Sequence, residues 1–221
     1  MKRKDKKNIR EEVNDLLSAT EVMLKYFKKR KKLFIPRSFF LMIHKEALRH
    51  KPNYAGRYRK PTDKIKIDAT FIPCKSWEVE HKIIDLLDFI NNKKKWSYKF
   101  EKYFIKTSGH KNFSKKQRKI LKIVFIAWYT HHQFVVIHPF CDGNGRVARM
   151  LMCLILAHNG FGRASFPPFL NTIINNKKEE YLDRLNEADS GNYVSGVMYM
   201  LDILSHSFNL TAETITKTIK N

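Results

Sequence analysis

The chain has 221 residues, a length that fits one globular domain or one domain with an extension. Hydrophobic residues make up 43% of it, which suffices for an apolar core and excludes a wholly disordered protein. Its three cysteines are widely spaced, which argues against a disulfide framework and against a paired-cysteine metal site. Neither a secretory leader nor a membrane-spanning run is expected, so we predict a cytoplasmic protein with no membrane partner.

The formal net charge is +22, and the basic residues gather in runs at 2–7, 28–32, 93–95 and 115–119. Clustered cations favour nucleic acid or an acidic surface, because binding releases phosphate counterions. The same composition is typical of a solvated basic surface, and the runs are scattered with no DNA-reading motif beside them. We favour the solvated surface and keep nucleic acid open as a partner.

Helical periodicity dominates the first half of the chain. Apolar residues at near-helical spacing predict helices over 11–32, 36–51 and 77–91. Alternating and β-branched residues predict a short strand or hairpin at 64–72. The stretch 93–112 is polar, aromatic and irregular, and we predict a loop that carries a short helix.

The second half predicts more helices and no further strand. A long, largely buried helix is expected at 114–136, with Ser114 as its N-cap. A central helix at 144–158 is apolar on nearly all sides, and two more helices follow at 177–189 and 193–208. The sequence therefore predicts a mainly α fold with one short β-hairpin.

The loop between the two most apolar helices carries a pattern that suits phosphate binding. A glycine-rich turn at 142–145 leads into a helix, where backbone N–H groups and the helix dipole favour an anion. Arg146 and Arg149 share one helical face, and two charges at the head of an apolar helix are costly without anionic partners. Two guanidinium groups beside such a turn indicate more than one phosphate.

Two further side chains complete the parts of a phosphoryl or nucleotidyl transferase. Asp142 would be repelled by phosphates unless a cation lay between them, which predicts Mg²⁺. His138 is placed to accept a proton from an attacking hydroxyl. Other interpretations stay open, since His138 could cap the preceding helix and Asp142 and Asn144 could be turn formers. Cys141 could act as a nucleophile, although its neighbours are more typical of a phosphate loop than of an oxyanion hole.

Residues 138–149, HPFCDGNGRVAR, resemble the full signature of the Fic family, H-x-F-x-(D/E)-G-N-G-R-x-x-R, with every defining position filled. The flanks are similar too: residues 127–131 resemble the family's helix before the loop. Residues 56–59 and the following β segment resemble its target-binding flap. The resemblance covers about residues 12–208. It implies a mainly α Fic fold, a helical bundle with a short β-hairpin flap.

We divide the chain accordingly into three parts. Residues 1–34 are predicted as a basic N-terminal helical extension that packs on the core, residues 35–208 as the Fic domain, and residues 209–221 as a short C-terminal tail.

The resemblance also implies an activity, that of a protein adenylyltransferase. Such an enzyme transfers AMP from ATP to a Ser, Thr or Tyr hydroxyl of a target protein and releases pyrophosphate. His138 would deprotonate the hydroxyl, and Asp142 would hold Mg²⁺ between the α- and β-phosphates. By the same resemblance, Gly143, Asn144 and Gly145 would cradle phosphate oxygens. Arg146 would contact the phosphates, and Arg149 would grip the γ-phosphate. Phe140 would pack the loop onto the core.

Other transfers on the same fold stay open, among them UMP or CDP-choline chemistry, phosphorylation, and removal of AMP. Doc-like relatives that phosphorylate have lysine at the second glycine of the signature, whereas this chain has Gly145, which favours AMP transfer. The alternative outside this chemistry is a non-enzymatic basic nucleic-acid-binding protein.

Many Fic enzymes carry an inhibitory helix of pattern (S/T)-x-x-x-E-(G/N), whose glutamate pairs with the second signature arginine. Ser76 with Glu80 and Ser97 with Glu101 have the first spacing, but neither glutamate is followed by Gly or Asn. We therefore expect a chain that is uninhibited in cis, or that is restrained by a separate antitoxin-like partner. A toxin-like role and self-association are further expectations.

Overall fold

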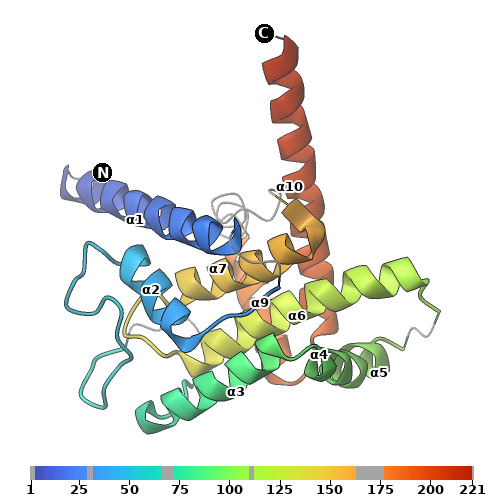
Figure 1. Cartoon of the computed structure of the whole chain (residues 1–221), viewed down its shortest axis with the longest axis horizontal. Coiled ribbons are helices and arrows are strands. Elements are labelled where there is room, and N and C mark those ends of the chain that lie inside the picture. Colours follow the sequence, from blue (N-terminus) through green and yellow to red (C-terminus); the bar gives the residue numbers. More distant parts are fainter. Residues whose placement is uncertain (1–2, 29–31, 66–71, 110–111, 163–176, 221) are drawn as a thin grey trace. The chain divides into compact units, whose positions relative to one another are not determined.

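The computed structural model describes the chain except for short segments. Described are residues 3–28, 32–65, 72–109, 112–162 and 177–220 (Figure 1). Within these residues every assigned element is a helix, of α, 3₁₀ or π type, which confirms the predicted mainly α class. Contacts divide the chain into two compact units. Unit 1 comprises Met1–Asn92 and Thr130–Leu151, and unit 2 comprises Lys93–Tyr129 and Met152–Asn221.

Unit 1 is built from complete helices and from parts of two longer ones. Its complete elements are α1 (Arg3–Lys28), α2 (Arg37–Ala47), a 3₁₀ turn (Ser76–Glu78) and α3 (Val79–Asn91). The end of α6 (Lys115–Ile137) and the beginning of α7 (Asn144–Leu156) complete it. The loop between these two helices therefore lies wholly within unit 1.

Helix α2 has one apolar face, and that face makes most of its packing. Phe39, Phe40, Ile43 and Ala47 recur near helical spacing and are all buried. Phe40 meets Phe134 of α6 edge to face, with ring centroids 5.3 Å apart. The face of α2 is thus fixed against the end of the helix that leads into the signature loop.

Helix α1 packs against the C-terminal end of α2 through polar contacts as well as apolar ones. Asp15 Oδ2 accepts from the His50 backbone N–H at 3.0 Å and lies 2.6 Å from His50 Nδ1. Ser18 Oγ donates to Glu46 Oε2 at 2.7 Å. The Asp15 side chain is only 9% exposed, so this end of α2 is held by α1 in a largely dry environment.

Unit 2 is helical too, and aromatic rings dominate its core. Its elements are α4 (Lys93–Phe100), a π turn (Glu101–Ile105), α5 (Lys106–Ser108), the remaining parts of α6 and α7, a second π turn (Ala157–Phe161), α9 (Lys178–Asp189) and α10 (Val194–Lys220). Phe125 meets Phe100 at 5.7 Å and Tyr193 at 5.8 Å between ring centroids. Gly196 of α10 lies directly against the indole of Trp128, which is fully buried.

The structure corrects two predictions in unit 2. The stretch 93–112 is largely helical, as α4, the π turn and α5, and the predicted loop is wrong there. Its buried rings, Trp96, Phe100 and Phe104, recur every four residues and form a helical stripe. At the C-terminus, α10 continues to Lys220, whereas the helix predicted there ends at residue 208.

Other local predictions have different outcomes. Ser114 caps α6 as predicted: its Oγ accepts from Gln117 N–H at 3.2 Å, and Gln117 Oε1 accepts from Ser114 N–H at 2.9 Å. Helix α7 gives way to the π turn after Leu156, and Gly160 there has a φ of 101°. The predicted hairpin at 64–72 falls mostly on residues 66–71, outside the described residues.

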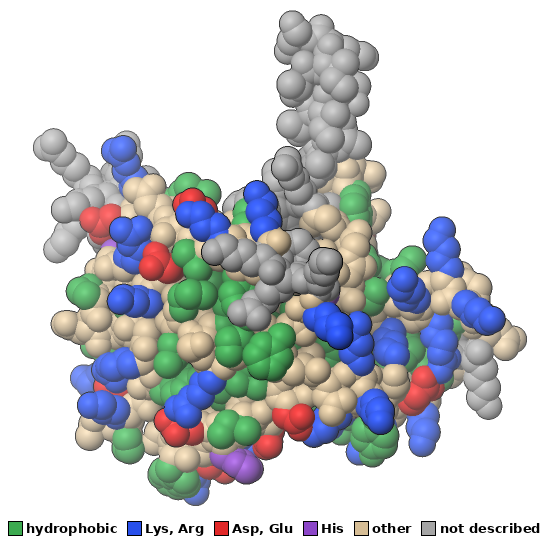
Figure 2. Space-filling view, in the orientation of Figure 1, with side chains coloured by type: hydrophobic (Ala, Val, Ile, Leu, Met, Phe, Trp, Pro, Cys, Tyr) green, Lys and Arg blue, Asp and Glu red, His purple; other side chains and the backbone are tan. Residues whose placement is uncertain are grey.

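Helix α6 is the one described helix long and apolar enough to cross a membrane by length and composition. Its most apolar window is 78% buried inside the protein, which is typical of a core helix. On the face drawn in Figure 2, Lys and Arg side chains are dispersed among apolar, neutral and acidic ones.

Candidate active site

All residues predicted for the site lie in unit 1, on the loop after α6 and the first turns of α7. His138 has a φ of 50°, which is unusual for a residue with a side chain and stores backbone strain. Its N–H donates to Phe134 O at 3.0 Å, and its carbonyl accepts from Arg59 Nε at 2.7 Å. Arg59 N–H also donates to Pro139 O at 2.9 Å. The backbone on both sides of the imidazole is therefore held.

The imidazole of His138 has a defined orientation. Its Nδ1 lies 3.2 Å from the carbonyl oxygen of Val135. Because a carbonyl only accepts hydrogen bonds, Nδ1 must carry the proton in the neutral ring. The lone pair of that tautomer is then on Nε2, the atom that could accept a proton from a substrate hydroxyl.

The centre of the loop is fixed by Phe140 and Asn144. Phe140 is fully buried and packs 6.1 Å from Phe134 between ring centroids. Asn144 Oδ1 accepts from Phe140 N–H at 2.9 Å, while its Nδ2 donates to Phe140 O at 2.8 Å. The Asn144 side chain thus orders the loop, and the part of this residue that remains suited to a phosphate is its backbone N–H at the start of α7.

His44 of α2 supports the same loop, and the sequence analysis did not single it out. Its ring stacks on Phe140 at 3.6 Å between centroids. Its Nδ1 accepts from Gly56 N–H at 2.9 Å, so Nε2 carries the proton and donates to Asp142 O at 2.9 Å. Burial lowers the pKa of His44 to about 4, which keeps the ring neutral in this role. One histidine in an otherwise apolar helical face was the available signal.

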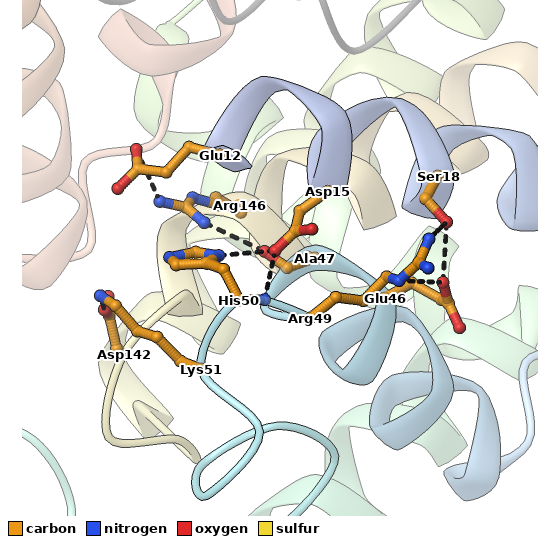
Figure 3. A network of polar contacts seen from close by, with 10 residues as sticks. All are labelled: Glu12, Asp15, Ser18, Glu46, Ala47, Arg49, His50, Lys51, Asp142 and Arg146. Atoms are coloured by element: carbon orange, nitrogen blue, oxygen red, sulfur yellow. Dashed lines mark hydrogen bonds and ion pairs between the residues drawn. The ribbon is translucent and has the colours of Figure 1, made fainter. Parts of the chain in front are cut away.

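Asp142 presents its two carboxylate oxygens to different partners. Oδ1 accepts from Gly143 N–H at 2.7 Å, and Oδ2 accepts from Lys51 Nζ at 2.6 Å (Figure 3). Burial alone would raise the pKa of Asp142, but the Lys51 ammonium, the Gly143 N–H and the Arg146 charge together hold it below its ordinary value. The carboxylate is therefore ionised near neutral pH.

The first turn of α7 combines backbone N–H groups with a guanidinium. Gly143 has a φ of 79°, and a Cβ there would lie 2.6 Å from Leu48 Cδ1, so the tight turn into the helix requires glycine. The first N–H groups of a helix have no acceptor inside it and suit an anion. Arg146 Nη1 donates to Ala47 O at 3.0 Å, and Nη2 pairs with Glu12 at 3.0 Å (Figure 3).

Arg149 lies across the same turn. A Cβ on Gly145 would be 3.1 Å from Arg149 Nη1, closer than most side chains tolerate, so the second glycine leaves space for this guanidinium. Burial, together with the Arg149 charge, lowers the pKa of the nearby His131 to about 3. The structure thus brings His138, Asp142 and both arginines onto one loop and helix N-terminus.

The two glutamates with the inhibitory spacing pair with arginines outside the signature. Glu80 pairs with Arg37 at 2.6 Å, and in unit 2 Glu101 pairs with Arg118. A carboxylate that meets a signature arginine is that of Glu12 of α1, on Arg146. Sequence reasoning did not identify Glu12, because it has no position in the inhibitory pattern.

Cys141 is a poor nucleophile in this setting. Burial raises the pKa of its thiol to about 11, and a hydrogen bond to Asp63 acts in the same direction. A thiol rather than a thiolate is therefore present near neutral pH, and the nucleophile interpretation loses its basis.

The donor groups of the loop fit one divalent cation shared with a nucleotide. Among residues 3–28, 32–65, 72–109, 112–162 and 177–220 no group of three or more His, Cys, Asp and Glu is arranged to hold a metal. Mg²⁺ is commonly bound through one or two carboxylates, with phosphate oxygens and waters completing its shell. Asp142, ionised and 24% exposed, provides such a carboxylate beside the α7 N-terminus.

Two curated relatives are similar to the central part of the chain. A "Protein adenylyltransferase Fic" of Nematostella vectensis is 42% identical over 76 residues, which is 34% of this chain and 16% of that protein. A "Probable protein adenylyltransferase" of Aquifex aeolicus is 34% identical over 105 residues, which is 48% of this chain and 28% of that protein. The chain thus aligns with less than a third of either relative.

The fold has solved counterparts. A Fic family protein from Desulfovibrio desulfuricans G20 superposes with a TM-score of 0.63 at 22% identity. The match covers 92% of this chain and 53% of the chain of that protein. A Fic domain containing signaling protein from Bacteroides thetaiotaomicron has a TM-score of 0.55 at 20% identity, with 89% and 70% covered. The model of the "Fic/DOC family" matches residues 34–156, more than half of the sequence. This chain belongs to the Fic/DOC family.

Proposed function

We propose that the chain is a protein adenylyltransferase that moves AMP from ATP to a hydroxyl of another protein and releases pyrophosphate. The observation that carries the proposal is the loop from His138 to Arg149, in which a base, a carboxylate and two guanidinium groups share one helix N-terminus. The curated relatives, both named as adenylyltransferases, support it. We further propose that the protein acts in the cytoplasm.

His138 acts as the general base in this proposal. With its proton on Nδ1 and hydrogen-bonded to Val135 O, its Nε2 takes the proton of a Ser, Thr or Tyr hydroxyl as the oxygen attacks phosphorus. The attacking oxygen forms a P–O bond at the α-phosphorus, and the bond to the bridging oxygen of pyrophosphate breaks. Arg59 acts through the backbone: it holds the His138 carbonyl and so fixes the direction in which the imidazole is presented.

The nucleotide's anionic chain is bound by the α7 N-terminus and the arginines. The N–H groups of the first turn and the positive end of the helix dipole face the phosphates. Arg146 is oriented by Ala47 O and Glu12, and Arg149 grips the end of the triphosphate. Asp142 would hold Mg²⁺, which would neutralise phosphate charge and assist departure of pyrophosphate.

The glycine at position 145 supports AMP transfer over phosphorylation. Any side chain there meets Arg149, since even a Cβ would lie 3.1 Å from its Nη1. With glycine, Arg149 can remain at the end of the triphosphate that leaves as pyrophosphate.

The test is label transfer from ATP. The purified chain is incubated with Mg²⁺, a cell lysate, and ATP labelled at either the α- or the γ-phosphate. We expect protein-bound label from the α position alone, and we expect His138→Ala to lower it by about a hundredfold or more, as loss of a general base does.

His81→Ala is the matched control, because the His81 side chain is 81% exposed on α3. We expect it to transfer label as the wild type does. Label from the γ position would replace the proposal by phosphorylation, and transfer from UTP in preference to ATP would replace it by uridylylation. Absence of any label, combined with salt-sensitive nucleic-acid binding that survives His138→Ala, would favour the non-enzymatic alternative.

A further inference from the structure

A lysine ammonium lies on the carboxylate that is proposed to bind the metal. Lys51 Nζ is 2.6 Å from Asp142 Oδ2 (Figure 3). The other carboxylate oxygen already accepts from Gly143 N–H at 2.7 Å. Oδ2 is therefore the oxygen for which an incoming cation would have to compete.

The backbone of Lys51 is fixed, whereas its side chain is not enclosed. Its N–H donates to Leu48 O at 2.9 Å, and its carbonyl accepts from Tyr54 N–H at 3.1 Å. The preceding residue, His50, is anchored to Asp15 of α1 through both its backbone N–H and its ring. The Lys51 side chain is 38% exposed. A fixed backbone with a four-carbon side chain lets the ammonium move by several ångströms without refolding.

The ion pair itself is weak enough to exchange. Pairs between partly exposed lysine and carboxylate groups contribute little, because water and salt screen them. An ammonium and a divalent cation on one carboxylate oxygen repel each other strongly at such a short separation. Binding of the metal therefore requires the ammonium to leave.

A bound triphosphate would offer the displaced ammonium a new partner. Arg146 adds a second positive charge to this region, and that charge contributes to the lowered pKa of Asp142. Lys51 contacts Asp142, and Arg146 lies in the first turn of α7, at the helix N-terminus proposed to bind the phosphates. A triphosphate placed there supplies the oxygens that an ammonium prefers.

We propose that Lys51 is an exchanging cation of the nucleotide site: it holds Asp142 in the nucleotide-free protein and moves to the phosphates when the metal and nucleotide bind. This inference rests on the proposed function, because it assumes that the loop binds a nucleoside triphosphate with a divalent cation. It assigns Lys51 two opposite effects, competition with the metal and attraction of the nucleotide.

Lys51→Met tests both effects by direct binding. The probe for the first is Mn²⁺ alone, titrated into the full chain and followed by electron paramagnetic resonance. We expect the variant to bind Mn²⁺ about threefold tighter or more, because its competitor is gone. The probe for the second is ATP with Mg²⁺ by calorimetry, and we expect its binding to weaken by about threefold or more.

Two variants make the comparison specific. Lys25→Met removes another lysine that pairs with a carboxylate, Glu21, at 2.7 Å on α1, and should change neither affinity. Lys51→Arg keeps a cation and should restore both affinities toward the wild type. A purely structural role of Lys51 would instead lower both affinities together, in parallel with the melting temperature.

Unchanged or weaker Mn²⁺ binding by Lys51→Met would overturn the proposal, and so would unchanged or tighter ATP binding. These outcomes differ from failure of the proposed function. If ATP binds and Lys51→Met shifts the two affinities in opposite directions while no α-label is transferred, Lys51 is confirmed and the adenylyltransferase proposal fails. If label is transferred and both affinities stay at wild-type values, the reverse holds.

Discussion

Polar side chains hold the backbone of unit 1 in place, whereas aromatic rings pack directly on one another in unit 2. In unit 1, Arg59, Asn144 and His44 each hydrogen-bond to the main chain of the signature loop. In unit 2, Phe125 contacts the rings of Phe100 and Tyr193. In unit 1 directional bonds fix the backbone of the signature loop, while the cited contacts of unit 2 are close packing between rings.

The contrast leads to different expectations for substitutions. Changes in unit 1 should alter transfer more than stability, because a displaced base or phosphate site loses rate steeply. Changes in unit 2 should alter stability and leave the site's affinity for ATP as it is. The following experiments can break or sharpen this division.

The largest effect is expected at Gly196. A Cβ there would lie 2.0 Å from Trp128 Nε1, and Trp128 is fully buried, so Gly196→Ala forces the helix or the indole to shift. Overpacking of this kind lowers the free energy of unfolding by up to about 3 kcal/mol. Urea denaturation measures the loss, and calorimetry at a temperature where the variant is folded should give the wild-type affinity for ATP.

Ser195→Ala is the matched control, because the Ser195 hydroxyl is buried without a hydrogen-bond partner among the described residues. We expect its stability to stay close to the wild type. If Gly196→Ala weakened ATP binding as strongly as it destabilised the fold, the proposed separation between the units would be wrong.

A smaller change is expected at Arg59, in the rate rather than in the fold. Arg59→Met leaves the His138 and Cys74 carbonyls without the guanidinium and lets His138 relax from its strained φ. A shift of about 1 Å in the imidazole lowers transfer by about a hundredfold. Steady-state kinetics should place the loss in kcat, with a smaller change in KM for ATP.

Arg59→Lys keeps one charged donor, and its kcat should lie between those of the wild type and Arg59→Met. This intermediate value distinguishes positioning of His138 from loss of charge alone. Arg49→Met, a change at an arginine whose side chain is 61% exposed, should leave kcat unaltered. Wild-type kcat in Arg59→Met would show that the loop keeps its geometry without this residue.

At neutral pH the smallest effect is expected at His44, whose contribution to the unfolding free energy changes only as the pH falls. Burial lowers the pKa of His44 from 6.5 to about 4, so in this window the unfolded chain binds a proton that the folded chain does not. The contribution of neutral His44 to the unfolding free energy is therefore fully present above about pH 6.5 and is lost as the pH falls toward 4. By linkage the loss approaches about 3 kcal/mol at the acidic end.

His44→Gln removes this titration and keeps a neutral polar side chain. Urea denaturation across the window should give a shallower dependence of the unfolding free energy on pH than in the wild type. His131 is also kept neutral by burial, but it is present in both proteins and cancels in the difference. Equal slopes would mean that His44 has the same pKa in the folded and the unfolded chain, and the lowered pKa assigned to it would be wrong.

The sequence was sufficient wherever the signal is local. The cap at Ser114, the loop after α6 and the start of α7 at Asn144 follow from residues within a few positions of one another. The signature at 138–149 is contiguous as well, so the candidate base, carboxylate and arginines could be identified from the printed order of residues. The stretch 93–112 was mispredicted as a loop because its charged residues hid the spacing of the few rings that are buried.

What only the tertiary structure decided is how the signature is held. His44 reaches Asp142 across 98 residues, Lys51 reaches it across 91, and Arg59 reaches His138 across 79. No spacing in the sequence marks such partners, because a hydrogen bond between distant segments depends on where packed helices bring their backbones. The sequence by itself therefore determined which residues are suited to the chemistry, and the packing of α1 and α2 against the loop decided their orientation, their charge state and the lysine that meets Asp142.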